Sequence, residues 1–342
     1  MQTEWSNFLE WTLANEPGSV SEQTLQLENG VTIEVWDSGV MAVTPAAAEA
    51  AKDIVISCAI HGDETAPIEL VRDMIADIIA QTLVPAHRVL FLIGNPWAIK
   101  QGTRFVHENM NRLFSGAHLK GDTMEHQRAE RLEFYVQRFY EANPNAQPER
   151  LHYDLHTAIR DSKFEKFAVY PFTHGKPYKK KELAFLAKAG VHTILLNRAP
   201  TTTFSYFSVK RFGADAFTVE LGKVRPFGQN DMARFADSDQ ALRELISERE
   251  LQLPDFDPDA HQIFDVAQTI DRTCEQFTLH FADDEANFTP FERGYVIATD
   301  GEREIKIEQP QAHIIFPNAK VKIGQRALLL VVQIPTTELE LV

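Results

Sequence analysis

Two side chains that commonly bind zinc lie three residues apart in the first quarter of the chain. His61 and Glu64 occur in the segment Ala-Ile-His-Gly-Asp-Glu-Thr-Ala-Pro-Ile-Glu. The apolar run before them has the pattern of a buried strand, and the stretch after them has the apolar spacing of a helix. Catalytic zinc commonly takes two histidines and one glutamate and keeps a fourth position for water. A second histidine should therefore come from elsewhere in the chain.

His156 is the best candidate for that second histidine. It lies at the end of another predicted strand, and open α/β sheets bind ligands at the carboxyl ends of their strands. Asp154 lies two residues earlier and so points to the same face, as a hydrogen-bond partner of the histidine or as a further metal-facing carboxylate. His152 shares this face. The alternative is that His61 is an ordinary hydrogen-bonded histidine of the core.

A zinc hydrolase also needs a carboxylate that takes a proton from water and delivers it to the leaving amine. Glu220 is the best candidate, because it ends the apolar strand Ala-Phe-Thr-Val-Glu-Leu-Gly. Burying a glutamate there would be costly unless it faced a cleft or a cation. The alternative is a solvated glutamate at a strand end.

A long non-periodic segment, 94–114, separates the two ligand segments and is rich in amides and cations. Functional loops commonly have this character. Arg104 can stabilise a developing oxyanion, and Asn111 with Arg112 can bind a substrate carboxylate, the arginine through its planar pair of donors. Taken alone, these arginines could equally be solvated loop residues. Joined to the ligand pattern, they indicate a site.

Alternation of short apolar strands with amphipathic helices over the first three quarters of the chain predicts an α/β fold, a mixed and mostly parallel sheet flanked by helices. From Leu253 the helical pattern stops, and apolar–polar alternation with turn signals predicts a smaller C-terminal β domain. We expect the two domains to cover 1–255 and 256–342. The expected strands of the first domain are 31–36, 54–60, 89–93, 151–156, 167–170, 193–196 and 217–221, and the expected helices are 68–81, 123–141, 179–189 and 233–251.

The formal charge of −15 argues against nucleic acid or anionic lipid as a partner, since both require clustered Lys and Arg. Cys58 and Cys274 are far apart and indicate no disulfide framework, which fits a reducing cytoplasm. The first residues lack the pattern of a secretory signal, and no apolar run approaches the roughly 18 residues of a membrane span. We therefore expect a cytoplasmic protein that neither spans nor binds membranes, and its oligomeric state stays open.

In combination, these segments resemble the zinc carboxypeptidase superfamily, and more closely its succinylglutamate desuccinylase and aspartoacylase branch. The resemblance covers nearly the whole chain, because that branch also carries a C-terminal β domain that narrows access to the metal. The runs His-Gly-Asp-Glu-Thr-Ala-Pro-Ile-Glu, Asp-Leu-His-Thr-Ala-Ile-Arg and Ile-Phe-Pro-Asn match the desuccinylase subgroup best. The motifs that carry the resemblance are His61-Gly-Asp-Glu64, Asn95-Pro-x-Ala98, Arg104, Asn111-Arg112, Asp154-Leu-His156 and Val219-Glu220.

The resemblance implies a zinc-dependent amide hydrolase that cleaves N2-succinyl-L-glutamate to succinate and L-glutamate, a step of bacterial arginine catabolism. It implies one zinc ion per chain and a promoted-water mechanism. The implied roles are zinc binding by His61, Glu64 and His156, water activation by Glu220, carbonyl polarisation by Arg104, and carboxylate binding by Asn111 and Arg112.

The substrate implied by the resemblance is a small anion with three carboxylates, so a net-acidic protein must collect cations locally to bind it. Arg160 and Arg225 lie next to strand ends and are candidates for this role. One departure concerns the β domain, where aspartoacylases place a tyrosine near the site and this chain reads Gln-Ala-His-Ile-Ile-Phe-Pro. No tyrosine role is assigned, and His313 is left without a role.

Two alternatives to this function stay open. The first is a hydrolase of another N-acyl amino acid or of a peptide C-terminus that uses the same metal. The second is a carboxylate-binding module in which zinc is structural. Structural zinc is usually closed by four protein ligands, often cysteines, whereas the pattern here predicts three ligands and an open position.

Overall fold

The protein is described by a computed structural model that covers residues 5–47, 51–143 and 148–342. The helices in these ranges are α1 (Phe8–Ala14), α2 (Thr65–Ile79), α3 (Pro96–Gln101), α4 (Met124–Glu141), α5 (Lys180–Lys188), α6 (Phe204–Phe212) and α7 (Ala236–Ser247). The strands are β1 (Gln23–Gln26), β2 (Thr32–Asp37), β3 (Val40–Thr44), β4 (Lys52–Cys58), β5 (Arg88–Ile93), β6 (Glu149–Ala158), β7 (Phe167–Tyr170), β8 (Thr193–Leu196), β9 (Asp215–Lys223), β10 (Gln262–Asp271), β11 (Phe277–Leu279), β12 (Pro290–Glu292), β13 (Val296–Asp300), β14 (Arg303–Lys306), β15 (Gln311–Ile315) and β16 (Arg326–Ile334).

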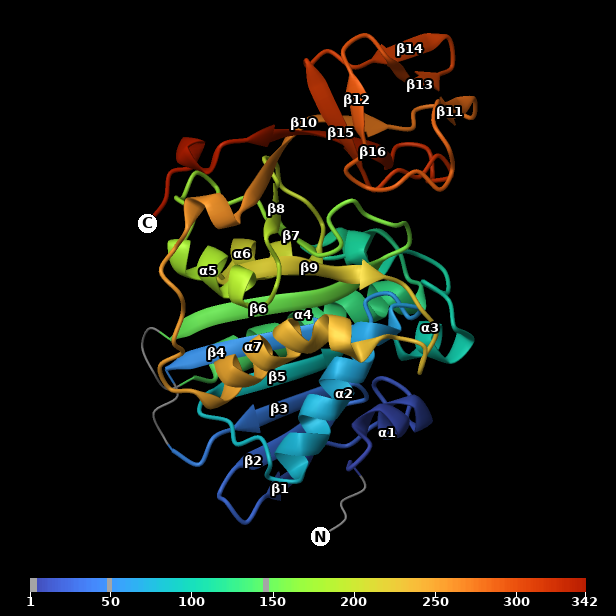
Figure 1. The fold of residues 1–342 in the computed structure, drawn as a ribbon. Coiled ribbons are helices and arrows are strands. Elements are labelled where there is room, and N and C mark those ends of the chain that lie inside the picture. Colours follow the sequence, from blue (N-terminus) through green and yellow to red (C-terminus); the bar gives the residue numbers. More distant parts are fainter. Residues whose placement is uncertain (1–4, 48–50, 144–147) are drawn as a thin grey trace.

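Thirteen of the strands in the described ranges form one long twisted sheet, in the order β1-β2-β3-β5-β4-β6-β9-β7-β8-β10-β16-β15-β12 (Figure 1). At its centre β5, β4, β6 and β9 are parallel. Their carboxyl ends therefore reach the same edge of the sheet, which is where α/β folds place ligands. Antiparallel neighbours, β3 and β7, flank this centre on its two sides. The predicted fold class, a mixed and mostly parallel sheet flanked by helices, is confirmed.

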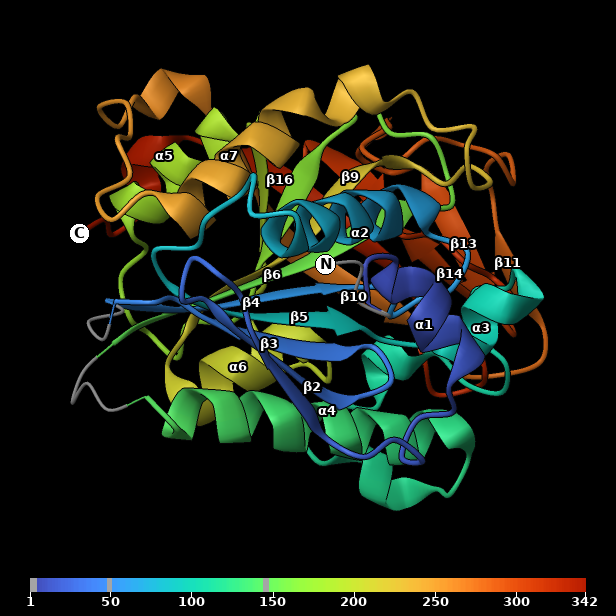
Figure 2. The same ribbon diagram turned by 90° about the horizontal axis from the view of Figure 1, so that it is seen from below.

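Two layers of helices cover the faces of the sheet. α2, α5 and α7 lie on one face, and α4 and α6 lie on the other (Figure 2). α4 shows why these segments fold as amphipathic helices, since it buries Leu132, Val136 and Phe139 at i, i+4 and i+7. Each helix layer thus closes a separate apolar core against the central strands.

The C-terminal β region begins with β10, a strand that also extends the sheet of the α/β region. The first residues of β10 pair in parallel with β8, and β10 also pairs with β16 in antiparallel fashion. A three-stranded sheet, β11-β13-β14, packs nearby around an apolar cluster that includes Ile297, Ile314 and Leu328. The last residues return to the α/β region, where the Val342 N–H donates to the Tyr178 carbonyl at 2.9 Å.

The seven strands and four helices expected for the α/β region all appear, with ends displaced by a few residues. The last expected helix, 233–251, is shorter, because a 3-10 turn precedes α7 and the chain is extended from Glu248. α1, β1, β3 and α6 lie where no element was predicted, and α3 lies inside the segment expected to be irregular. α6 is rich in Phe, Tyr and Val, which favours strands, although Thr203 as its N-cap and Gly213 as its left-handed C-cap are helix signals.

No helix within the described ranges is both long and apolar enough to cross a membrane.

Candidate active site

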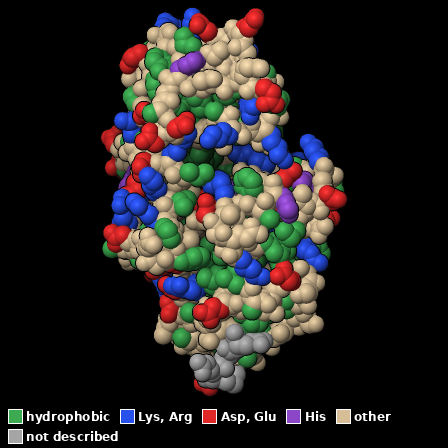
Figure 3. Space-filling model, turned by 90° about the vertical axis from the view of Figure 1, so that its right-hand side faces the viewer, with side chains coloured by type: hydrophobic (Ala, Val, Ile, Leu, Met, Phe, Trp, Pro, Cys, Tyr) green, Lys and Arg blue, Asp and Glu red, His purple; other side chains and the backbone are tan. Residues whose placement is uncertain are grey.

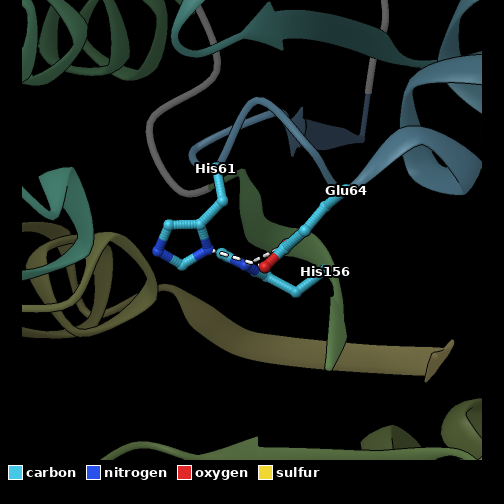
Figure 4. A group of neighbouring side chains, drawn as sticks. All are labelled: His61, Glu64 and His156. Carbon is cyan, nitrogen blue, oxygen red and sulfur yellow. Dashed lines mark hydrogen bonds and ion pairs between the residues drawn. The ribbon is translucent and has the colours of Figure 1, made fainter. Parts of the chain in front are cut away.

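Three side chains predicted as metal ligands meet at the carboxyl edge of the central strands. His61 lies in the turn after β4, Glu64 is the N-cap residue of α2, and His156 lies on β6 (Figure 4). All three are buried, and their candidate ligand atoms lie within 4.8 Å of one another. The fold thus brings together residues that are up to 95 positions apart in the sequence.

The tight turn between His61 and Glu64 depends on glycine at position 62. A Cβ atom there would lie 2.2 Å from the carbonyl carbon of Ala98, so a larger residue would force α3 away. The Gly62 N–H also donates to the carbonyl of Arg104 at 3.1 Å. This glycine therefore lets the ligand turn and the loop that carries Arg104 approach each other.

Both histidines direct one ring nitrogen towards the Glu64 carboxylate. Nδ1 of His61 lies 2.8 Å from Oε1, and Nδ1 of His156 lies 2.9 Å from Oε2 (Figure 4). The Thr157 backbone N–H donates to Oε2 at 3.1 Å and fixes the carboxylate further. Two imidazoles and one carboxylate are a donor set that suits zinc.

The outer ring nitrogens show that this donor set favours a cation at its centre. His61 Nε2 lies 2.9 Å from Oδ1 of Asn109, and the same oxygen accepts the Asn111 N–H at 3.0 Å, so it is an acceptor and the histidine donates. His156 Nε2 likewise donates to Asp154 at 2.9 Å. A neutral histidine that donates through Nε2 presents a lone pair at Nδ1. When both rings are neutral, their lone pairs and those of Glu64 face one another, and a cation bound between them relieves the repulsion.

The electrostatics of the cluster also favour positive charge at its centre, here as a proton on His156. Burial, followed by the Arg104 charge, lowers the pKa of His61 to about 4. Burial alone would raise the pKa of Glu64, but its interactions with His61, His156 and Arg104 outweigh burial and hold that pKa well below its usual range. Burial likewise opposes a charge on His156, yet Asp154 and Glu64 raise its pKa well above its ordinary value. Positive charge next to Glu64 is therefore favoured.

A buried chain of hydrogen bonds leads away from His156. Asp154 accepts from His156 through Oδ2, and its Oδ1 accepts from the Ser57 hydroxyl at 2.6 Å. The Ser57 oxygen lies 2.8 Å from Nε2 of His152, whose Nδ1 lies 2.7 Å from the Ser208 hydroxyl. Asp154 is thus the partner that orients a ligand, one of the two roles predicted for it.

Glu220 lies on β9 opposite His156 in the register of the two strands, and it lines the cleft. Its Oε2 is buried and has no hydrogen-bond partner within the described chain. Burial raises the pKa of Glu220 to about 7, against the opposing charge of His156 and with a further contribution from Glu64. A carboxyl group that titrates near neutrality can both accept and donate a proton.

The three residues predicted in the 94–114 segment also reach the cleft. Arg104 donates through Nη1 to Oε1 of Glu64 at 2.7 Å, so its charge lies beside the candidate ligands. Asn111 accepts the Phe204 N–H at 2.9 Å and is thereby fixed against the start of α6. Arg112 donates to the Asn111 carbonyl at 2.9 Å.

The loop that carries these residues is held by Glu125, near the start of α4. Oε1 of Glu125 accepts the backbone N–H groups of Val106 at 2.7 Å and His107 at 3.1 Å. Asn95 donates to the same oxygen at 3.4 Å and caps α3 by accepting the Ala98 N–H at 3.1 Å. The Asn95-Pro-x-Ala98 motif therefore supports the loop and does not itself line the cleft.

The cleft has a volume of about 1550 Å³ and lies between the α/β region and the C-terminal β region (Figure 3). Among the described residues that line the cleft, eight are Lys or Arg and six are Asp or Glu. The whole chain, by contrast, has 34 Lys or Arg and 49 Asp or Glu residues. The acidic excess of the chain is thus reversed around the site, as an anionic ligand requires.

The remaining candidates differ in their placement. Arg160 lines the cleft, with Nη1 at 3.5 Å from the Glu285 carbonyl. Arg225 is exposed and is not among the lining residues; its carbonyl accepts from the Thr65 hydroxyl at 2.6 Å. His313, left without a role, lies outside the cleft lining, with its ring 5.1 Å from that of Phe264. The fold therefore brings Arg160 to the site but not the side chain of Arg225.

Asn109 is a site residue that the sequence analysis missed. It orients His61, and its only sequence signal is membership of the amide-rich segment that also contains Asn111. Ser57 and Ser208 were missed as well, because an isolated serine in a strand or a helix carries no motif.

Comparison with known proteins agrees with the fold and identifies the family. Residues 50–246 match the model of the succinylglutamate desuccinylase/aspartoacylase catalytic domain, and residues 259–334 match that of the AstE/AspA barrel-sandwich hybrid domain. The chain is 57% identical to a succinylglutamate desuccinylase of Idiomarina loihiensis, with all of both chains covered, and 50% identical to one of Shewanella frigidimarina, with 96% of each covered.

A solved succinylglutamate desuccinylase from Vibrio parahaemolyticus superposes with a TM-score of 0.86 at 38% identity, covering 96% of this chain and 95% of that one. Both domain models, the full-length relatives and this fold agree on one assignment. The chain therefore belongs to the succinylglutamate desuccinylase/aspartoacylase family.

Proposed function

We propose that this protein hydrolyses N2-succinyl-L-glutamate to succinate and L-glutamate, and that it uses one zinc ion for this reaction. The names of its full-length relatives support the substrate. The observation that carries the chemistry is the convergence of two Nδ1 atoms and a carboxylate beside a buried Glu220. This reaction would place the protein in arginine catabolism.

His61, Glu64 and His156 would hold the ion, with Asn109 and Asp154 fixing the two imidazoles from outside. When bound, zinc supplies Lewis-acid chemistry, acidifying water and polarising a carbonyl oxygen. The three protein ligands are fewer than a closed structural site usually has, which favours a catalytic role over a structural one.

Glu220 takes a proton from the attacking water and later delivers it to the departing amine. Its position opposite His156 and its pKa near 7 support both transfers. Arg104 stabilises the oxyanion that forms on the scissile amide, since its guanidinium lies beside the ligand cluster. Asn111 and Arg112 bind a substrate carboxylate, and Arg160 adds positive charge to the cleft.

We further propose that residues 1–255 form the catalytic domain and residues 256–342 a β domain that caps the site. The cleft is lined by residues of both ranges, such as Arg112 from the first and Phe316 from the second, which supports a capping role for the β domain. The small anionic substrate and the two separate cysteines fit a cytoplasmic enzyme.

The nearest alternative is hydrolysis of another N-acyl amino acid or of a peptide C-terminus. Purified protein should be assayed for released amine on N-succinylglutamate, N-acetylaspartate and a dipeptide, with metal content measured on the same sample. We expect about one zinc per chain, preference for N-succinylglutamate, and loss of activity on chelation that zinc restores. Preference for N-acetylaspartate or the dipeptide would overturn the substrate, and full activity without any divalent metal would overturn the mechanism.

A further inference from the structure

The C-terminal β region contributes one arginine to the cleft that no motif predicts. Arg326 opens β16 of the C-terminal β region, whereas Arg112 lies in the 94–114 segment of the α/β region. Both arginines line the same cleft, and the Arg326 charge acts on Arg112 strongly enough to lower the pKa of the latter, second only to burial. Two cations thus face a shared space.

Neither arginine forms an ion pair with a carboxylate of the described chain. The Arg112 guanidinium donates only to the backbone carbonyl of Asn111, and the Arg326 guanidinium has no ion pair or hydrogen bond in the described ranges. Asp271 is opposite Arg326 on β10 but forms no ion pair with it. Burial lowers the pKa of Arg326 to about 10 against the opposing charge of Asp271. Burial and the Arg326 charge lower the pKa of Arg112 to about 9. Unpaired charges in such surroundings destabilise the protein unless a counter-ion binds.

The ring of Phe316 supports the Arg326 guanidinium from one side. The carbon atom of the guanidinium lies 5.6 Å from the ring centroid, within the range of a cation–π contact. Phe316 has a φ of 51°, in the left-handed region that non-glycine residues rarely adopt, and its N–H donates to Asn287 at 2.9 Å. The backbone is therefore held in an unfavourable conformation that places this ring under the arginine, as functional sites often require.

Two other cations of the cleft lining, Lys223 and Arg198, are already paired with carboxylates. Lys223 donates to Asp161 at 2.6 Å, and Arg198 makes a two-bonded pair with Asp265 at 2.6 and 2.8 Å. Arg326 and Arg112 thus differ from these neighbours in keeping their donors available. Lys and Arg side chains gather around the hollow between the two regions in Figure 3.

We propose that Arg326, together with Arg112, binds a carboxylate of the substrate, so that the C-terminal β region takes a direct part in substrate selection. This inference rests on the proposed function for the identity of the substrate. A planar guanidinium with free donors matches a carboxylate in two-bonded geometry, and the substrate offers three such groups.

The first test compares kcat/KM for N-succinylglutamate with three analogues that each lack one negative carboxylate. They are N-succinyl-γ-aminobutyrate, N-succinyl-L-glutamine and N-butyryl-L-glutamate. Arg326→Gln should lower kcat/KM for N-succinylglutamate by about 10- to 100-fold, as expected for loss of a charged hydrogen-bonded pair. For the analogue that lacks the recognised carboxylate, the loss should nearly vanish. An equal loss on all four compounds would overturn the inference.

Lys223→Gln is the matched control, because it removes a lining cation that is already paired. Its kcat/KM should change less than threefold on every compound, and a loss equal to that of Arg326→Gln would overturn the inference. The melting temperature of Arg326→Gln should be unchanged or higher, since a repulsion is removed, whereas a lower value would assign the arginine a structural role instead.

A second test needs no turnover. Calorimetric titration of the purified protein with propane-1,2,3-tricarboxylate should show binding by the wild type and by Lys223→Gln, and at least tenfold weaker binding by Arg326→Gln. Equal binding by all three would overturn the inference. Absence of N-succinylglutamate hydrolysis by the wild type would refute the proposed function alone, because the titration still decides the role of Arg326.

Discussion

Removal of the Ser57 hydroxyl should weaken zinc binding although Ser57 lies two hydrogen bonds from the nearest proposed ligand. The hydroxyl donates to Oδ1 of Asp154 at 2.6 Å, and Oδ2 of the same carboxylate holds Nε2 of His156 at 2.9 Å. Because that hydroxyl proton is committed to Asp154, the Ser57 oxygen must accept from Nε2 of His152. Burial lowers the pKa of His152 to about 4, so the ring is neutral and its Nδ1 accepts from Ser208.

The chain therefore runs in one direction, from Ser208 through His152 and Ser57 to Asp154. All four side chains are buried, with exposed fractions of 0%. Ser57→Ala leaves the Asp154 oxygen and the His152 N–H without partners at a place where water has little access. Loss of an outer-shell partner of a metal ligand typically costs about 10- to 100-fold in metal affinity. Ser57 acts through Asp154, so we expect the lower end, about tenfold or roughly 1.4 kcal/mol.

The affinity for Zn²⁺ should be measured by competition with a chromophoric chelator, with Ser208→Ala as a second variant. Ser208→Ala, one step further along the chain, should weaken zinc binding less than Ser57→Ala. Ser238→Ala is the control, because it removes an equally buried hydroxyl that donates to Ala189 at 2.7 Å outside the chain of bonds. Wild-type zinc affinity in a folded Ser57→Ala protein, or the same loss in Ser238→Ala, would refute the reasoning.

Two further predictions concern buried carboxyl groups. Glu220→Gln should keep the zinc content and lower kcat by about 10²- to 10⁴-fold, the usual contribution of a general acid–base group; near-normal turnover would remove this role. Burial, with the nearby Asp215 charge, raises the pKa of Glu182 from 4.5 to about 7. Its contribution to stability is therefore complete below pH 4.5 and lost as the pH rises through 7, at a cost of about 3 kcal/mol. In urea unfolding, Glu182→Gln should thus gain stability relative to wild type at pH 8 but not at pH 4.5, and an equal difference at both would contradict the assignment.

Much of the fold and of the candidate ligand set follows from the sequence, because the signals are local. The three-residue spacing of His61 and Glu64, the two-residue spacing of Asp154 and His156, and the apolar periodicity of the surrounding segments are each contained in a short window. Parallel strands bring their carboxyl ends to one edge, so the strand-end positions of His61 and His156 predict that these two side chains converge.

Helix α6 shows where local signals conflict. Its aromatic and β-branched residues favour a strand, whereas packing of Phe204 and Phe207 against α4 and the sheet selects the helix. Considered alone, this segment could bury its apolar side chains either as a strand or as a helix. Only the neighbouring elements decided which form buries it.

Residue types and their spacing determined which groups could bind a metal and move a proton, whereas the tertiary structure decided which groups meet them. The hydrogen bonds of Asn109 with His61 and of Ser57 with Asp154 join segments far apart in the chain, and the same holds for the shared cleft of Arg326 and Arg112. Arg225 and Arg160 both follow strand ends, yet only Arg160 reaches the cleft. Such contacts depend on strand register and on the packing of the C-terminal β region, which are set by long-range burial and leave no periodic pattern in the sequence.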